Sequence, residues 1–349
     1  MVHLLGRCNL RCRHCYMQGA PDRHERLSPK AVIQAINDSG SLGIGTLYLT
    51  GGEPLLYRAF PDVLNAASRI RELRTTVCTN ATLIKGRYAT LLAESGARVN
   101  VSIDGDEQFH DYFRDFDGAY RAAESGVRTL VESGINVTIV TTISQSNLHM
   151  LEHIAEWSAT VGAVELRIQP LLSLGRGIAI ANQRLSSQQL NELVIQLSDI
   201  SNRYRRSLKC GMIGVTRRML VAHPCAAYVC NGLGCHRRVA REIKKIVIRE
   251  DGTVLPEITN LSHEFAIGNI DDGPLPVLVS QYFNNGYEKF DKLCRLAYSQ
   301  VLPEWKDVIV PWDQIVADES YKWHKRTQSC SEHELPNPVC GTCSSPAMR

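Results

Sequence analysis

The sequence predicts an α/β protein in which an incomplete parallel barrel is followed by a smaller, cysteine-rich region. Two observations carry this prediction. Up to about residue 207, short β-branched runs alternate with helical stretches, which is the pattern of βα units around a parallel sheet. After Ser207 the alternation stops, and eight of the twelve cysteines lie between Cys210 and Cys343.

The first part contains six predicted strand–helix units. The strands are expected at Val2–Gly6, Thr46–Thr50, Thr75–Thr79, Arg98–Ile103, Asn136–Ile143 and Val164–Gln169. The first helix is expected to begin with Ser28 as N-cap and Pro29 at its first position. Later helices are expected near Asp62–Arg71, Tyr88–Ser95, Tyr120–Ser133, Leu148–Val161 and Ser187–Arg206. Six units predict a partial (β/α)6 TIM barrel, since a full eight-unit barrel would need more length.

The second part is expected to be a separate small domain. Lys245–Arg249 and Thr253–Leu255 predict a hairpin turned by Asp251-Gly252. A helical, aromatic-rich stretch follows to about Lys325, and the chain ends near Cys340-Gly341-Thr342-Cys343. We therefore expect a barrel domain over residues 1–207 and a C-terminal domain over residues 208–349.

Composition excludes several classes of function. The formal net charge is only +3 and no long basic block is present, so neither nucleic-acid binding nor a polybasic membrane patch is predicted. No apolar run reaches membrane-spanning length, and the segment before Cys8 is too short and polar for a signal peptide. We expect a cytoplasmic protein, whose cysteines stay reduced and serve metal binding or catalysis.

Cys8, Cys12 and Cys15 follow the first predicted strand with the spacing Cys-x3-Cys-x2-Cys. Three thiolates on one short loop can bind three irons of a [4Fe–4S] cluster and leave the fourth iron open. A zinc site with His14 as fourth ligand is the alternative, although structural zinc usually takes paired CxxC units. Cys78, inside a strand, is expected to be a small buried apolar residue.

A second motif closes the next predicted strand. It consists of Thr50, Gly51, Gly52, Glu53 and Pro54. Paired glycines let a backbone edge approach a ligand closely, and Glu53 offers an acceptor for an ammonium group. Alone, the motif could simply be a turn that ends a strand.

Together, the cysteine triplet and the Gly-Gly-Glu-Pro segment resemble the signature of the radical S-adenosylmethionine (SAM) superfamily. The resemblance implies that the triplet holds the cluster, that His14 lies near the adenine, and that the Gly-Gly-Glu-Pro segment receives the SAM amino group. Further candidate cofactor-binding residues at strand ends or just after them are Asn80, Ser102, Asp104 and Arg176. For Asn80 and Asp104 the alternative is an ordinary turn residue, and for Arg176 a solvated loop charge.

The C-terminal cysteines resemble the ligands of a SPASM or twitch domain, which carries auxiliary iron–sulfur clusters. Cys235 precedes the predicted hairpin, and Cys340 and Cys343 form the late Cys-x2-Cys pair. Where the family pattern has a cysteine five residues after the hairpin glycine, this chain has Glu257. We expect one auxiliary [4Fe–4S] cluster, whose fourth ligand is Glu257, Cys230, Cys225, Cys330 or the substrate; zinc remains an alternative.

The resemblance implies an enzyme that reductively cleaves SAM to a 5′-deoxyadenosyl radical, which then abstracts hydrogen from a substrate. The leading hypothesis for the substrate is a ribosomally made peptide, modified by epimerisation, crosslinking or excision. One alternative is a sugar or aminoglycoside dehydrogenase or epimerase. Another is a non-catalytic iron–sulfur or zinc protein, which would have no need of the Gly-Gly-Glu-Pro segment. Expected partners are a flavodoxin- or ferredoxin-like electron donor and a separate peptide-recognition protein, because no such domain fits before Cys8.

Overall fold

The computed structural model describes residues 1–223, 227–228, 243 and 245–327. The chain packs into two compact units. The first consists of Met1–Ile213 with Arg249–Gly252, and the second of Gly214–Ile248 with Thr253–Arg349. Each unit is described by itself below.

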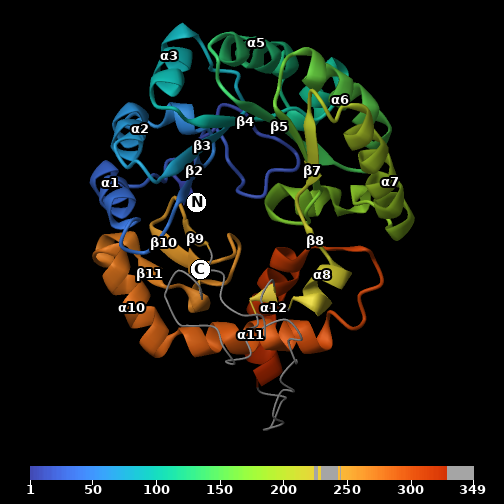
Figure 1. The fold of residues 1–349 in the computed structure, drawn as a ribbon. Coiled ribbons are helices and arrows are strands. Elements are labelled where there is room, and N and C mark those ends of the chain that lie inside the picture. The colour runs from blue at the N-terminus through green and yellow to red at the C-terminus, as the bar shows by residue number, and fades with distance from the viewer. Residues whose placement is uncertain (224–226, 229–242, 244, 328–349) are drawn as a thin grey trace, which may run out of the picture. The chain divides into compact units, whose positions relative to one another are not determined.

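A curved parallel sheet forms the centre of the first unit (Figure 1). Its strands follow one another in chain order: β1 (Val2–His3), β2 (Thr46–Thr50), β3 (Arg74–Thr79), β4 (Arg98–Ser102), β5 (Val137–Ile143), β6 (Glu165–Pro170) and β7 (Lys209–Met212). All neighbouring strands in this series pair in parallel. Consecutive parallel strands need crossover connections, and helices supply them.

Six helices of this unit lie on the outside of the curve (Figure 1). They are α1 (Pro29–Asp38), α2 (Phe60–Ser68), α3 (Gly86–Glu94), α5 (Ala119–Glu132), α6 (Leu151–Thr160) and α7 (Ser187–Arg203). The unit also contains helix α4 (Glu107–Arg114) and the 3-10 segments η1 (Pro54–Leu56), η2 (Leu148–Met150) and η3 (Gly175–Gln183). Pro29 is the first residue of α1, as expected, although the Ser28 side chain makes no capping hydrogen bond.

Period-two alternation along the strands separates the core from the interior of the curve. Leu49, Val77, Val101, Ile139 and Leu166 are fully buried. Their neighbours along each strand point to the opposite face of the sheet. That opposite face lines the cavity described in the next subsection.

The α/β fold class and the partial parallel barrel are confirmed, with differences in detail. The expected strand Val2–Gly6 is shorter, because the Leu5 and Arg7 carbonyls accept hydrogen bonds from Gly52 and Glu53 instead of continuing a ladder. A seventh strand, β7, was not predicted, since Lys209–Met212 contains a glycine and no β-branched residue. It pairs with β6, so the first unit continues to Ile213 rather than ending at the expected residue 207.

The second unit contains the predicted hairpin, formed by β9 (Ile246–Ile248) and β10 (Thr253–Pro256) as an antiparallel pair. Its other elements are β8 (Val215–Thr216), α8 (Arg217–Ala222), η5 (His263–Phe265), β11 (Gly268–Asn269), η6 (Ile270–Asp272), α10 (Leu275–Asn285), α11 (Tyr287–Gln300), β12 (Ile309–Val310) and α12 (Trp312–Thr327). Among the described residues, no helix has the length and apolar character needed to cross a membrane.

Candidate active site

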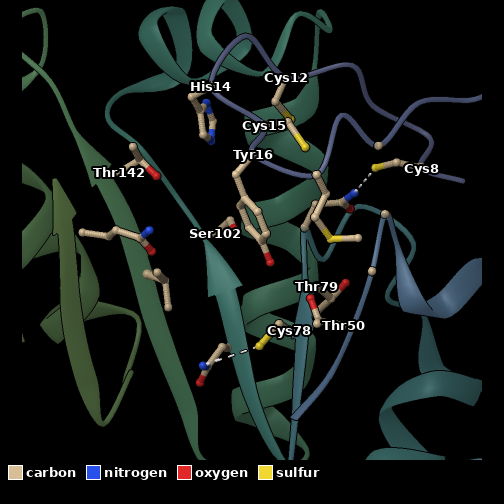
Figure 2. A pocket seen from close by; sticks show the side chains of 18 of the residues that line it. Cys8, Cys12, His14, Cys15, Tyr16, Thr50, Cys78, Thr79, Ser102 and Thr142 are labelled. Carbon is tan, nitrogen blue, oxygen red and sulfur yellow. Dashed lines mark hydrogen bonds between the residues drawn. The ribbon is translucent and has the colours of Figure 1, made fainter. Parts of the chain in front are cut away.

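A cavity of about 420 Å³ opens within the first unit, between the cysteine-bearing loop and the carboxyl ends of the parallel strands. Figure 2 shows Cys8, Cys12 and Cys15 on the loop and Thr50, Thr79, Ser102 and Thr142 at the strand ends. The cavity therefore brings together two motifs that lie about forty residues apart in the sequence. Barrels of parallel strands usually build their active sites at this face.

The three cysteines lie on the loop after β1, and all three line the cavity. Burial raises the pKa of Cys8 to about 12, and burial likewise raises the pKa of Cys12. Thiols in this environment stay protonated unless a bound cation compensates the charge of the thiolate. The donor set thus fits a metal cluster bound by sulfur.

A single metal ion fits less well. Among the residues that the structure describes, no three His, Cys, Asp or Glu side chains converge on one metal-ion position. The ligands of one zinc ion must converge on a point, whereas each cysteine of a [4Fe–4S] cluster binds a different iron. The Cys-x3-Cys-x2-Cys spacing therefore favours a cluster over a single zinc ion.

Arg176 makes three hydrogen bonds to backbone carbonyls of the cysteine loop. Its Nε donates to the Cys12 carbonyl at 2.7 Å and its Nη2 to the Gly19 carbonyl at 2.8 Å. Its backbone N–H donates to the Cys15 carbonyl at 3.0 Å. Arg176 is not among the residues that line the cavity. In this structure it orders the loop, and the alternative of a merely solvated charge is wrong.

The two glycines of the Gly-Gly-Glu-Pro segment allow a close approach, but to the protein's own backbone. A Cβ at Gly52 would lie 2.1 Å from the Arg7 carbonyl oxygen, and one at Gly51 would lie 2.6 Å from that of Leu5. Gly51 also has a φ of +137°, which L side chains rarely adopt. Both glycines line the cavity. They fix the turn against the start of the cysteine loop.

Glu53 is fully buried and is not among the cavity-lining residues. Its carboxylate accepts hydrogen bonds from Thr79 Oγ1 at 2.7 Å, from the Asn80 backbone N–H at 2.9 Å and from the Leu55 backbone N–H at 3.2 Å. Burial raises the pKa of Glu53 to about 7. In this structure the carboxylate thus serves three protein donors, and its contact with a ligand ammonium stays a prediction. Pro54 is also buried and begins η1.

Asn80 is hydrogen-bonded to Glu53 and also lines the cavity. Its backbone is held by Glu53, while its side-chain amide lies 3.8 Å from Cys8 Sγ and donates to Asn9 Oδ1 at 3.0 Å. Asn80 lines the cavity, as does Ser102. Both sequence-predicted positions therefore face the site.

Asp104 does not face the cavity. It is fully buried and forms an ion pair with Arg114 at 2.8 Å. Burial by itself would raise the pKa of Asp104, but the Arg114 guanidinium, together with His14, His110 and the Thr142 backbone N–H, outweighs it, so the pKa is lowered. Arg114 lines the cavity and lies 3.9 Å from Cys12 Sγ. Asp104 thus positions a cation beside a cysteine, instead of contacting a ligand directly.

His14 lies beside this ion pair and lines the cavity. Its ring stacks on Phe113 at 4.1 Å between centroids. Burial lowers the pKa of His14 to about 3, so the ring is neutral. Its Nδ1 is buried without a hydrogen-bond partner, which leaves one acceptor or donor available to a bound group.

Cavity-lining residues occur as pairs two positions apart on, or directly after, five consecutive strands: Tyr48 and Thr50, Cys78 and Asn80, Asn100 and Ser102, Val140 and Thr142, Arg167 and Gln169. Thr50, Asn80 and Ser102 were predicted, whereas the other seven were missed. The signal for them is a mostly polar pattern with period two along these strands. The expectation for Cys78 was wrong, since its thiol faces the cavity and accepts from Asn100 Nδ2 at 3.7 Å.

The predicted auxiliary ligands fall largely outside the described residues: Cys225, Cys230, Cys235, Cys330, Cys340 and Cys343. Glu257 is described. It follows β10, is buried with 1 % of its surface exposed, and adopts a φ of +58°. Its backbone N–H donates to the Lys245 carbonyl at 2.7 Å.

Comparison with known proteins shows which family the first part of the chain resembles. Residues 2–158 match the family model of the radical SAM superfamily. The chain is 33 % identical over 190 residues to the Fe-coproporphyrin III synthase of Methanosarcina barkeri, covering 54 % of this chain and 47 % of that protein. It is 30 % identical over 176 residues to the sporulation killing factor maturation protein SkfB of Bacillus subtilis, covering 50 % of this chain and 43 % of SkfB. The chain thus spans about half the length of these relatives.

Solved structures share the fold. SuiB of Streptococcus suis bound to S-adenosylmethionine superposes with a TM-score of 0.65 at 17 % identity, covering 84 % of this chain and 67 % of SuiB. The protein anSMEcpe with bound AdoMet and a peptide gives a TM-score of 0.64 at 15 % identity, covering 94 % of this chain and 98 % of that one. The cysteine loop and most of the strand-end cavity lie within residues 2–158, and this segment matches the radical SAM superfamily.

Proposed function

We propose that this protein is a cytoplasmic enzyme that cleaves SAM reductively at a [4Fe–4S] cluster and modifies a ribosomally made peptide. The match of residues 2–158 to the radical SAM superfamily supports both the cluster and SAM as cofactors. The observation that carries the proposal is the cavity of about 420 Å³, into which the three cysteines and the ends of the parallel strands all face. Cys8, Cys12 and Cys15 would hold the cluster.

When bound, the cluster and SAM supply the one-electron chemistry that activates the substrate. The chain's own residues would bind and orient these cofactors and exclude water from the cavity. Arg176 and the Gly51–Gly52 turn hold the cysteine loop in place. Arg114, paired with buried Asp104, keeps a positive charge 3.9 Å from Cys12 Sγ and would stabilise its thiolate.

SAM itself would occupy the part of the cavity next to the cysteine loop. Neutral polar side chains surround that part: Thr50, Asn80, Ser102 and Thr142. Hydroxyl and amide groups of this kind can hydrogen-bond an amino acid and a ribose without a full charge. His14, neutral and stacked on Phe113, adds a flat surface with an unpaired Nδ1.

The similarity of this chain to SkfB, SuiB and anSMEcpe supports a peptide substrate. The anSMEcpe structure contains a bound peptide. The Fe-coproporphyrin III synthase among the relatives keeps a small-molecule substrate as the second candidate. As partners we propose a flavodoxin- or ferredoxin-like electron donor and a separate peptide-recognition protein. A second [4Fe–4S] cluster at Cys235, Cys340 and Cys343, with Glu257 or Cys230 as fourth ligand, completes the proposal.

Anaerobic reconstitution tests the central claim. Wild type should bind four irons per cluster with labile sulfide and should release 5′-deoxyadenosine from SAM when given a chemical reductant. Cys12→Ala should abolish this release, whereas Cys294→Ala, a buried cysteine of the second unit, should leave it intact. A colourless, zinc-containing protein without sulfide would show that the triplet is a zinc site.

Mass spectrometry of the reaction mixture tests the substrate. A short peptide encoded beside the gene should change mass or stereochemistry only when SAM and reductant are both present. If a porphyrin precursor changes and no peptide does, the second candidate holds.

A further inference from the structure

The cavity is two residues deep, and its two layers differ in charge. The upper layer consists of Thr50, Asn80, Ser102, Thr142 and Gln169, all neutral. The lower layer comes two residues earlier on the same five strands and consists of Tyr48, Cys78, Asn100, Val140 and Arg167. Since side chains two residues apart share one face of a strand, the lower layer forms the floor beneath the upper one.

Arg167 is the charged residue of this floor. Among the described residues that line the cavity, the side chains with a full charge at neutral pH are Arg114 and Arg167, and none is Asp or Glu. Arg114 is paired with buried Asp104 at 2.8 Å, and its guanidinium lies 3.9 Å from Cys12 Sγ, so its charge faces the cysteine loop. The remaining cationic character of the cavity therefore rests on Arg167.

The partners of Arg167 leave a net positive charge. Its Nη2 donates to Glu165 Oε2 at 2.9 Å, and the side chain is 29 % exposed. Glu165 also lies 4.0 Å from Lys209 Nζ, on the strand paired with it in register. One carboxylate is thus shared by two cations. It positions Arg167 from two residues earlier on the same strand and does not cancel the net positive charge of the three groups.

We propose that Arg167 forms a carboxylate-binding subsite on the cavity floor, which receives an acidic group of the substrate. Arginine presents several N–H donors in a fork that matches a carboxylate, and one Nη is committed to Glu165. Two amides that line the same cavity add neutral donors: Asn100 in the same layer, two strands away on β4, and Gln169 one layer above Arg167 on β6. The inference rests on the proposed function, because it assigns SAM to the upper layer.

This subsite separates the candidate substrates. A peptide that presents an acidic side chain or its terminal carboxylate matches the floor, and so does any small molecule with carboxylate groups. A polycationic aminoglycoside does not match, since a cavity without Asp or Glu among its described lining residues offers its ammonium groups no counter-charge.

A carboxylate probe tests the subsite without turnover. Glutarate, and glutaramide as its uncharged analogue, are titrated by NMR or calorimetry into reconstituted, SAM-loaded protein. Glutarate should bind wild type and glutaramide should not. Arg167→Gln should weaken glutarate binding by about 10- to 100-fold, as expected for hydrogen bonds to a charged group, and Arg167→Lys should retain part of it. The control is Arg128→Gln, which breaks an exposed Arg–Glu pair on α5 and should change nothing.

SAM has a carboxylate of its own, so the affinity for SAM alone is measured for the same variants. It should change less than about twofold in Arg167→Gln. A tenfold loss of SAM affinity, with glutarate competing against SAM, would show that the subsite serves the cofactor and would overturn the proposal. Equal glutarate binding by wild type and Arg167→Gln, or none by wild type, would also overturn it. Failure to release 5′-deoxyadenosine in wild type would instead refute the proposed function.

Discussion

Glu53 gives the sharpest test, because sequence and structure assign it different roles. As part of the Gly-Gly-Glu-Pro segment it is expected to accept a hydrogen bond from the SAM ammonium. In the structure it is fully buried and accepts from Thr79, Asn80 and Leu55. The substitution Glu53→Ala in the metal-free protein separates the two roles.

The expected change in unfolding free energy for Glu53→Ala has two parts, one from the three donors and one from the buried charge. Leaving a buried donor without an acceptor costs about 1–3 kcal/mol, so three donors together would cost on the order of 3–9 kcal/mol. Against this, burial raises the pKa of Glu53 from 4.5 to about 7. At pH 8 the buried charge therefore costs the wild type about 3 kcal/mol, which the variant does not bear.

The raised pKa of Glu53 determines how the stability of the folded protein depends on pH. The protonated carboxyl is favoured in the folded state, so this contribution to wild-type stability is complete below pH 4.5 and declines as the pH rises towards 7. Glu53→Ala should consequently be destabilised most at pH 5, and the difference from wild type should shrink by about 3 kcal/mol at pH 8.

Urea unfolding of the metal-free proteins under reducing conditions, at pH 5 and pH 8, measures both quantities. Thr90→Ala, an exposed helix position in α3, serves as control. An unchanged unfolding free energy in Glu53→Ala, together with a tenfold loss of SAM affinity in the reconstituted protein, would refute the structural role and restore the direct ammonium contact.

Three further predictions concern the loop, the buried ion pair and the second cluster. Arg176→Ala removes two hydrogen bonds to loop carbonyls, so amide exchange of residues 8–19 should accelerate and iron should be lost faster on dilution; unchanged exchange would contradict this role. Asp104→Asn leaves the buried Arg114 without its carboxylate and should lower the unfolding free energy by about 3–5 kcal/mol, whereas Asp106→Asn, which keeps a capping oxygen for Phe109, should cost less than about 1 kcal/mol. Replacing Cys340 and Cys343 by alanine should reduce iron from about eight to about four per chain; iron content equal to wild type would exclude the auxiliary cluster at these cysteines.

Local patterns were enough to predict the type of most elements. Five of the six predicted strands closely match β2 to β6, because β-branched runs and turn residues act over a few neighbours. The hairpin around Asp251-Gly252 was predicted for the same reason. Strand β7 was missed because Lys209–Met212 carries a weak local signal. Helix α4 was missed although Asp106 is an N-cap, Glu107 lies in its first turn and Arg114 in its last.

The sequence by itself determined the chemistry of the site: a cysteine triplet with cluster spacing, followed by a Gly-Gly-Glu-Pro strand end. Only the tertiary structure decided which residues face the cavity. Glu53 and Asp104 look like ligand contacts in a motif, yet both are buried among protein donors. Cys78, Asn100 and Arg167 look like ordinary strand residues, yet they line the floor. The physical reason is that the face a strand residue occupies depends on how the sheet curves and which side the helices cover, and no local run of residues encodes that.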